Sequence, residues 1–283
     1  MTLRTRFAPS PTGHLHIGHG YAALMVEAEA RRLGAAVTLR IEDTDATRCR
    51  PAFTEAIIED LTWLGFGWDR LVVQSERLAH YDAAITRLAA DGLAYRCFCS
   101  RKEVAAAATK TGPEGPLYPG TCRGLDPDVA AARAEIEPYG WRFDHRAAMN
   151  RYGRLSWRDS DGVAHIAEPG LLGDVLLASR DRPASYHLAV VVDDAADAIS
   201  HVVRGADLLL ATHIHRLLQA ALGLATPVYH HHKLLLDSDG RKLAKSRVSM
   251  ALTTLRQSGV EAIALRRDLM EKRFPAGITL QTP

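Results

Sequence analysis

The stretch LRTRFAPSPTGHLHIGH, residues 3–19, decides the fold of this chain. Its first part, Leu3 to Ala8, alternates apolar and polar side chains as a short strand does, and a loop rich in proline follows. Apolar residues then recur at helical spacing from Tyr21 to Leu33, and Gly34 is a typical end for such a helix. A strand that leads through a loop into a helix is the opening of a parallel α/β sheet.

The alternation of strand and helix continues along the N-terminal third. Ala36 to Ile41 predicts a second strand, which is followed by the acidic turn EDTD at residues 42–45. Pro51 suits the first position of a helix that extends to Leu64, with Gly65 behind it. Another helix is expected over Arg77–Ala90. This order predicts a parallel sheet with covering helices.

The pattern loosens between about residues 95 and 180, which predicts an insertion. Beyond it, residues 186–192, YHLAVVV, are apolar on both alternating faces, as in a buried parallel strand. A further strand is expected at Ile199–Val203. Three more helices are expected, over Leu208–Leu222 with Gly223 at its end, Met250–Gln257 and Val260–Lys272.

Composition places the chain among ordinary globular proteins. Its 283 residues, 47% hydrophobic and 24% charged, suffice for one large core or for a core with a small satellite domain. A net charge of +2 is too mild to indicate nucleic acid by itself, although a local basic patch is compatible with it. There is no apolar run of about 18 residues and no secretion signal, so we expect a cytoplasmic monomer with no membrane partner.

The first candidate motif is His16-Ile17-Gly18-His19, at the expected start of a helix. Backbone N–H groups and the positive end of the helix dipole favour phosphate at such a place. Two imidazoles could donate to the phosphates of ATP while the purine lies against Gly18. The alternative is that both histidines merely cap the helix.

The second candidate motif is Lys242-Leu243-Ala244-Lys245-Ser246, after the turn Ser238-Asp239-Gly240. Its two lysines could neutralise the charge that develops on pyrophosphate as it leaves ATP, an effect that acts mainly on the transition state. The alternative is a solvated basic loop.

Together with RIEDTD at residues 40–45 and VRGAD at residues 203–207, these motifs resemble the class I aminoacyl-tRNA synthetases of the glutamyl type. The first motif matches the HIGH signature, and the second stands for KMSKS with Leu243 and Ala244 substituted. The resemblance covers roughly residues 1–250. It implies a Rossmann-type, HUP-like α/β catalytic domain that condenses L-glutamate with ATP, accompanied by Mg²⁺, to glutamyl-adenylate.

The resemblance also implies a division of the chain. Four parts are expected: a first Rossmann half (1–94), an inserted zinc-binding, acceptor-type subdomain (95–180), a second Rossmann half with the KMSKS-like loop (181–247), and a short helical C-terminal remnant (248–283) without an anticodon-binding domain.

Site residues follow from the same resemblance. The catalytic residues would be His16, His19, Lys242 and Lys245, and ATP would be bound by His16, Gly18, His19 and Lys245. The glutamate pocket would consist of Arg6, Phe7, Ala8, Pro9, Ser10, Glu42, Tyr186 and Arg204. The chemistry is reasonable because a guanidinium presents a rigid fork to a carboxylate, a role that suits Arg204 with Arg6. Glu42 could hold the α-ammonium group. Core packing for Tyr186 and a surface ion pair for Arg204 are the alternatives.

The cysteines indicate a metal site, because a cytosolic protein keeps its thiols reduced. Cys97, Cys99 and Cys122 offer three thiolates, and tetrahedral zinc needs four ligands. In the truncated paralogue of glutamyl-tRNA synthetase, the pattern Y-x-x-x-C supplies a tyrosine, which Tyr118 matches here. Tyr118 could instead pack beside a site completed by water, or the site could be empty. Cys49 is far from the other three cysteines in the sequence, and we interpret it simply as a small side chain.

Only residues 247–283 follow Ser246, whereas a full glutamyl-tRNA synthetase continues with an anticodon-binding domain. The chain therefore resembles the truncated paralogue, which implies activation of glutamate without tRNA and its transfer to the queuosine base at the wobble position of tRNA(Asp). The alternatives are a conventional glutamyl-tRNA(Glu) synthetase of minimal length, another nucleotidylyl transferase of the superfamily, and a non-catalytic tRNA-binding module. Retention of both motifs argues against the last.

Overall fold

The computed structural model describes residues 2–243 and 251–282, which form two compact units. The first unit comprises Met1–Ser75, Ile199–Leu208 and Val228–Pro283, and the second comprises Glu76–Ala198 and Leu209–Pro227. The second unit thus holds the segment expected as an insertion together with neighbouring helices on both sides of it in sequence.

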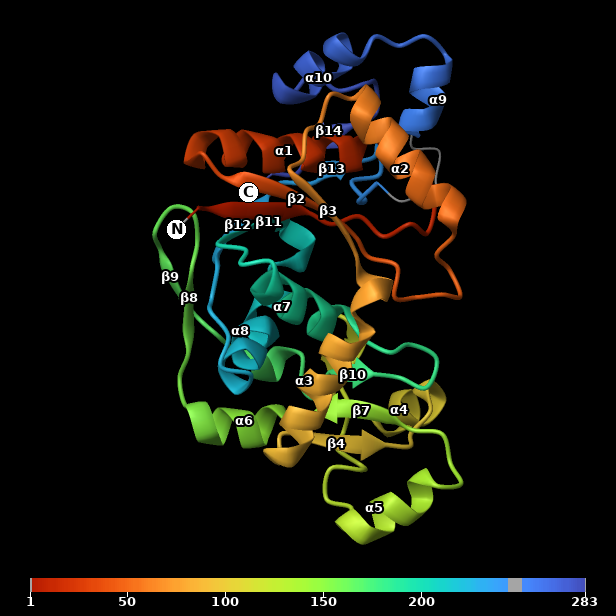
Figure 1. Cartoon of the computed structure of the whole chain (residues 1–283), viewed down its shortest axis with the longest axis vertical. Helices are drawn as coiled ribbons and strands as arrows, with labels where there is room; N and C mark the ends of the chain where they lie inside the picture. Colours follow the sequence, from red (N-terminus) through yellow and green to blue (C-terminus); the bar gives the residue numbers. More distant parts are fainter. Residues whose placement is uncertain (1, 244–250, 283) are drawn as a thin grey trace. The chain divides into compact units, whose positions relative to one another are not determined.

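A parallel sheet forms the centre of the first unit (Figure 1). Strands β1 (Arg4–Phe7), β2 (Ala36–Ile41) and β3 (Arg70–Val73) pair in that order, and β11 (His201–Gly205) pairs with β12 (Val228–His232). Strand β11 lies beside β1, where the Ser200 N–H donates to the Arg4 carbonyl at 3.0 Å. The strands therefore follow the order β3-β2-β1-β11-β12.

Helices cover this sheet and complete its core. Helix α1 (Ile17–Leu33) packs on β1, β2 and β11 and ends at Gly34, whose φ of 63° is the left-handed conformation that glycine adopts most easily. Helix α2 (Pro51–Trp63) contacts α9 (Leu252–Gln257), and α10 (Ala262–Met270) contacts α1. The remaining elements are an antiparallel pair, β13 (Leu235–Leu236) with β14 (Thr279–Leu280), and the 3-10 turns Gln74–Arg77 and Ala206–Leu208.

The second unit contains an antiparallel sheet in the order β10-β7-β4, with a core of its own. Its strands are β4 (Ala94–Cys97), β7 (Gly140–Phe143) and β10 (Leu176–Ala178), and two small hairpins pair β5 (Thr111–Gly112) with β6 (Gly115–Pro116) and β8 (Ser156–Arg158) with β9 (Ala164–Ile166). Its helices are α3 (Leu78–Ala90), α4 (Arg101–Ala107), α5 (Pro127–Ala134), α6 (His145–Tyr152), α7 (Tyr186–Ala196) and α8 (Ala211–Ala221), with a 3-10 turn at Pro169–Leu171.

One expected strand is wrong. Residues 186–192 lie in α7, a helix buried against α3, α8 and β10, with Leu188, Val190 and Val191 at most 3% exposed. A short apolar run is compatible with either a buried strand or a buried helix, because periodicity alone does not separate them. The deciding signal is Ser185, whose hydroxyl caps the helix by accepting from the Leu188 N–H at 3.3 Å.

Most other sequence-based elements of the first unit are confirmed. Strand β2 has the expected bounds, and α1 and α2 end where their glycines indicate. Strand β11 begins two residues later than expected, and strands β3 and β12 were not predicted. Among the described residues, no helix is long and apolar enough to cross a membrane.

Candidate active site and metal centre

The site motifs of the first unit gather at the carboxyl edge of its parallel sheet. The strand order reverses between β1 and β11, which lie side by side although they are far apart in sequence (Figure 1). Ligands of open α/β sheets bind outside the carboxyl ends of the strands at such a reversal. His16, Glu42 and Asp207 follow β1, β2 and β11 respectively, so the topology brings these three segments to one place.

His16 and His19 both take part in the N-terminal cap of helix α1. The Nδ1 atom of His16 accepts from the Gly18 N–H at 3.1 Å, and the Nδ1 atom of His19 accepts from the His16 N–H at 3.1 Å. An Nδ1 atom that accepts is unprotonated, so each neutral ring carries its proton on Nε2. The centres of the two imidazole rings lie 3.8 Å apart. The capping role considered from the sequence is confirmed, and it orients the Nε2–H groups that phosphate binding would use.

Gly18 is required by the close approach of His16. A Cβ atom at this position would lie 2.9 Å from Cε1 and 3.0 Å from Nδ1 of the His16 ring. Any larger residue would therefore push the imidazole away from position 18 and strain the cap. Sequence reasoning assigned Gly18 to the purine, and the structure adds this local reason for glycine.

The expected glutamate-binding residues of the first unit are largely buried. Arg6 lies in β1, 3% exposed, with Nη1 donating to the Val203 carbonyl at 3.1 Å, and Arg204 lies in β11, 6% exposed. The Glu42 N–H donates to the Pro9 carbonyl at 3.1 Å, which joins the ends of β1 and β2. The Glu42 carboxylate accepts from the buried Arg40 at 3.3 Å. The structure thus places Arg6, Pro9, Glu42 and Arg204 on neighbouring strand ends.

The other expected pocket residues differ in their surroundings. The Phe7 side chain belongs to the hydrophobic core and packs edge-on against Phe66 at 5.6 Å, so only its backbone could face a ligand. Ala8, Pro9 and Ser10 continue from β1 as a loop. Tyr186 belongs to the second unit, where it is the first residue of α7.

The second motif is described only in part, because Lys245 lies outside the described residues. Lys242 forms an ion pair with Asp207, which follows β11 in the VRGAD segment. Gly205 makes this possible, since a Cβ atom there would approach the Asp207 carboxylate and lie 2.7 Å from Cδ2 of Leu234. Asp207 is a charged partner of Lys242 to which the sequence motifs assign no role.

The residues that flank the undescribed segment contact the first motif on both sides. Leu243 is buried in the same core as Leu15 and Ile17, and the Leu252 N–H donates to the Leu15 carbonyl at 2.8 Å. Ala251 forms a β-bridge with His16. Residues on both sides of the undescribed segment therefore lie beside the histidine motif.

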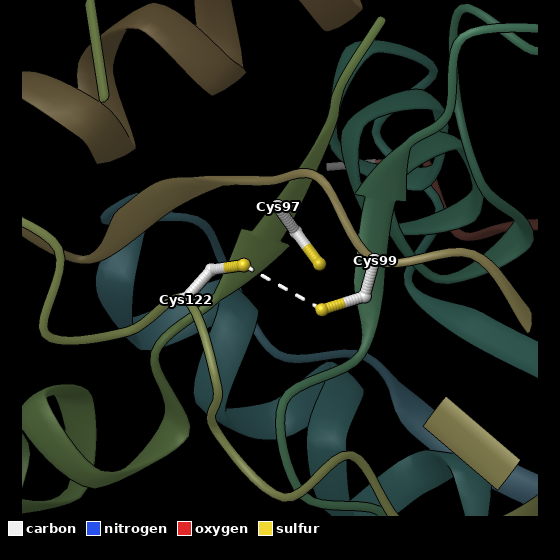
Figure 2. Close-up of side chains that lie close together, drawn as sticks. All are labelled: Cys97, Cys99 and Cys122. Atoms are coloured by element: carbon white, nitrogen blue, oxygen red, sulfur yellow. Dashed lines mark hydrogen bonds between the residues drawn. The ribbon is translucent and has the colours of Figure 1, made fainter. Parts of the chain in front are cut away.

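The metal candidates come together in the second unit. Cys97 ends β4, Cys99 follows it, and Cys122 lies in a turn, with all three sulphur atoms within 4.8 Å of one another (Figure 2). The Sγ atoms of Cys99 and Cys122 are 3.6 Å apart. Two sulphur ligands of a tetrahedral zinc ion, each bound at about 2.3 Å, would be about 3.8 Å apart, which is close to this distance. The hydroxyl of Tyr118 lies 3.4 Å from Cys97 and 3.5 Å from Cys99.

This donor set fits zinc. Three soft sulphur atoms and one phenol oxygen converge in a place where Cys97, Cys122 and Tyr118 are less than 8% exposed. Burial, together with hydrogen bonds to the cysteines, raises the pKa of Tyr118, so its phenol keeps its proton unless a cation is bound. The compact cluster is compatible with a Cys₃Tyr site.

Arg142 adds a positive charge to the cysteine cluster. Its Nε donates to Cys97 Sγ at 3.3 Å, its Nη1 donates to the Asp174 carbonyl at 2.7 Å, and its guanidinium carbon lies 3.9 Å from the centre of the Tyr118 ring. A guanidinium here would offset part of the negative charge of metal-bound thiolates. The signal in the sequence is weak, because Arg142 reaches Cys97 only through the pairing of β7 with β4, which places it opposite Tyr95, two residues before Cys97.

The fold, the histidine pair and the cysteine cluster agree with the family that matches the chain. A model of the catalytic domain of class I tRNA synthetases for glutamate and glutamine (E and Q) matches residues 2–276. The chain belongs to this family. It is a ligase with a Rossmann-like α/β fold, and its partners are glutamate, ATP and tRNA.

Individual relatives are similar to the chain over most of its length. The chain is 41% identical to glutamyl-Q tRNA(Asp) synthetase of Rhodobacter capsulatus, over 93% of this chain and 98% of that protein. It is 38% identical to glutamate–tRNA ligase of Parasynechococcus marenigrum, over 98% of this chain and 60% of that protein. Among solved structures, a glutamate tRNA ligase from Elizabethkingia meningosepticum in complex with its amino acid is similar, with a TM-score of 0.79, 27% identity, and coverage of 96% of this chain and 61% of that one.

Proposed function

We propose that this protein activates L-glutamate with ATP in the absence of tRNA and transfers it to the queuosine base at the wobble position of tRNA(Asp). The observation that carries the proposal is the similarity to the Rhodobacter capsulatus protein, which extends over almost the whole length of both chains. The site geometry supports the activation step, because it supplies oriented donors and buried guanidinium groups at the switch point of the sheet.

Activation would begin with attack of the α-carboxylate of glutamate on the α-phosphorus of ATP. Pyrophosphate leaves, and a glutamyl-adenylate anhydride forms. The Nε2–H groups of His16 and His19 would donate to phosphate oxygens, and Lys242 and Lys245 would offset the charge on pyrophosphate as it departs. Mg²⁺ would accompany ATP, as expected for this class.

Glutamate would be selected by its two charged ends. Arg204 with Arg6 would bind the side-chain carboxylate, and Glu42 would hold the α-ammonium. In the transfer step, a hydroxyl of the queuosine diol would attack the activated carbonyl, forming an ester and releasing AMP. Zinc at Cys97, Cys99, Tyr118 and Cys122 would have a structural role.

Glutamate-dependent exchange of pyrophosphate into ATP tests the first step. We expect exchange without tRNA, and exchange that appears only after tRNA(Glu) is added would contradict the proposal. His16→Asn and His19→Asn are informative variants, because the asparagine oxygen can replace Nδ1 as the capping acceptor while the Nε2–H donor is lost. Exchange should fall roughly 100-fold or more while the melting temperature is kept. Wild-type exchange in both variants would remove the histidines from the site.

Charging assays test the acceptor. Labelled glutamate should become attached to tRNA(Asp) that contains queuosine and not to tRNA(Asp) that lacks it. Periodate oxidation of the queuosine diol should abolish the product. Charging of the 3′ end of tRNA(Glu) instead would establish the conventional reaction and overturn the queuosine assignment.

A further inference from the structure

A histidine in β12 holds the arginine expected to recognise glutamate. Strands β11 and β12 are parallel, and their register places His231 directly opposite Arg204. The Nε of Arg204 donates to Nε2 of His231 at 3.3 Å. The guanidinium carbon of Arg204 also lies 5.3 Å from the centre of the Tyr229 ring, and this ring is parallel to that of His231 at 5.9 Å. Arg204 is thus held by an acceptor and an aromatic face from one strand.

The protonation state of His231 follows from this contact. A guanidinium can only donate, so the Nε2 atom of His231 must offer its lone pair, and the neutral ring carries its proton on Nδ1. Burial first, and then the nearby charge of Arg204, lower the pKa of His231 to about 3. The imidazole therefore remains neutral throughout the physiological range of pH.

A neutral acceptor has a specific advantage beside this arginine. A carboxylate in the place of His231 would cancel the charge of Arg204 and compete with an anionic ligand. The imidazole fixes the guanidinium through its Nε edge without cancelling its charge. A carboxylate that approaches the two terminal nitrogens would meet a fork whose orientation is already set, which lowers the entropic cost of binding.

We propose that His231 is a positioning residue that sets the orientation of Arg204 for the side-chain carboxylate of glutamate and thereby favours glutamate over glutamine. This inference rests on the proposed function, in which Arg204 binds that carboxylate. His231 acts through Arg204 and touches no reacting atom.

Variants at position 231 separate the acceptor from the ring. His231→Phe keeps an aromatic ring beside Tyr229 and removes the acceptor, whereas His231→Gln offers an amide oxygen to the Arg204 Nε. In glutamate-dependent exchange without tRNA, we expect the KM for glutamate to rise roughly 10- to 100-fold in His231→Phe, as for loss of a hydrogen bond to a charged group. The KM for ATP should stay unchanged, and the preference for glutamate over glutamine should fall. His231→Gln should recover most of both properties.

His230→Phe is the matched control, because it makes the same change as His231→Phe at the neighbouring position of the same strand. It should leave both KM values unchanged. If His231→Phe fails to fold, as judged by its thermal transition, the comparison of His231→Gln with His231→Leu provides the same contrast. An unaltered KM for glutamate in a folded variant without the acceptor would overturn the inference.

Arg204→Lys distinguishes failure of the inference from failure of the proposed pocket. If this variant binds glutamate normally, Arg204 is outside the pocket and the proposed glutamate site is wrong. If it raises the KM for glutamate while folded His231→Phe does not, the pocket stands and only the positioning role is refuted.

Discussion

Replacement of Gly18 by alanine should separate catalysis from stability. The new Cβ atom would lie 2.9 Å from Cε1 and 3.0 Å from Nδ1 of His16, so the imidazole must shift, which strains its cap on α1. Loss of an N-cap hydrogen bond costs about 1 kcal/mol. Alanine is favoured over glycine within a helix by up to about 1 kcal/mol. These two effects nearly cancel, so the melting temperature should change by less than about 3 °C.

The effect on the reaction should be much larger. His16 would no longer present its Nε2–H where the cap now places it, and a displacement of about 1 Å can cost roughly 100-fold in rate. We therefore expect glutamate-dependent ATP–pyrophosphate exchange to fall by about that factor, measured at saturating ATP and glutamate.

Gly20→Ala is the control for this variant. A Cβ atom at Gly20 would lie 3.4 Å from Leu64 and 3.5 Å from Leu252, which are tight to ordinary contacts with flexible side chains. This variant should keep its exchange activity. Full activity in Gly18→Ala would refute the link between the cap and catalysis, and a large loss in both variants would point to the helix as a whole.

Three further predictions concern the metal, the core and pH. Arg142→Met should weaken zinc binding roughly 10- to 100-fold in competition with a chromogenic chelator, because the thiolates lose a charged donor. An equal zinc affinity in Arg142→Met and wild type would exclude that role for Arg142. Arg151→Met, on the exposed end of α6, is the control and should bind zinc normally. Leu188→Ala should lower the free energy of unfolding by about 2–5 kcal/mol in urea titrations, since Leu188 is fully buried in α7, whereas a loss below 1 kcal/mol would contradict this packing. The folded-state pKa of His231 lies near 3 and its ordinary value is 6.5, so this residue contributes stability that is complete above about pH 6.5 and is lost as the pH falls toward 3. Wild type should therefore lose about 2 kcal/mol relative to His231→Gln between pH 7 and pH 5, and parallel stability curves would show that His231 is not held neutral.

The sequence predicted the N-terminal half of the first unit well because its signals are local. The alternation from β1 to α2 is marked by Gly34, Pro51 and Gly65, each of which acts on the backbone beside it. The run at residues 186–192 was misassigned because a helix buried on most of its surface loses the 3.6-residue period. Strand β12 was missed because its three consecutive histidines do not have the composition of a typical strand.

The candidate site likewise contains residues that the sequence indicates and residues that only the structure reveals. The histidine pair and the cysteine cluster are recognisable because each has a short motif, and the structure brings the members of each together. Asp207, Arg142 and His231 act through partners on other strands or loops. Such partners depend on strand register, which a single sequence does not specify.

The place of α9 and α10 in the core bears on how the chain folds during synthesis. Leu252 and Leu269 are fully buried in the same cluster as Leu15 and Ile17, so the first unit cannot complete its core until those late residues are available. Strands β11 and β12, which finish its sheet, also come from the last third of the chain. Domains generally fold as units during translation. The histidine motif at residues 16–19 should therefore acquire its final geometry only after residues 252–269 have left the ribosome.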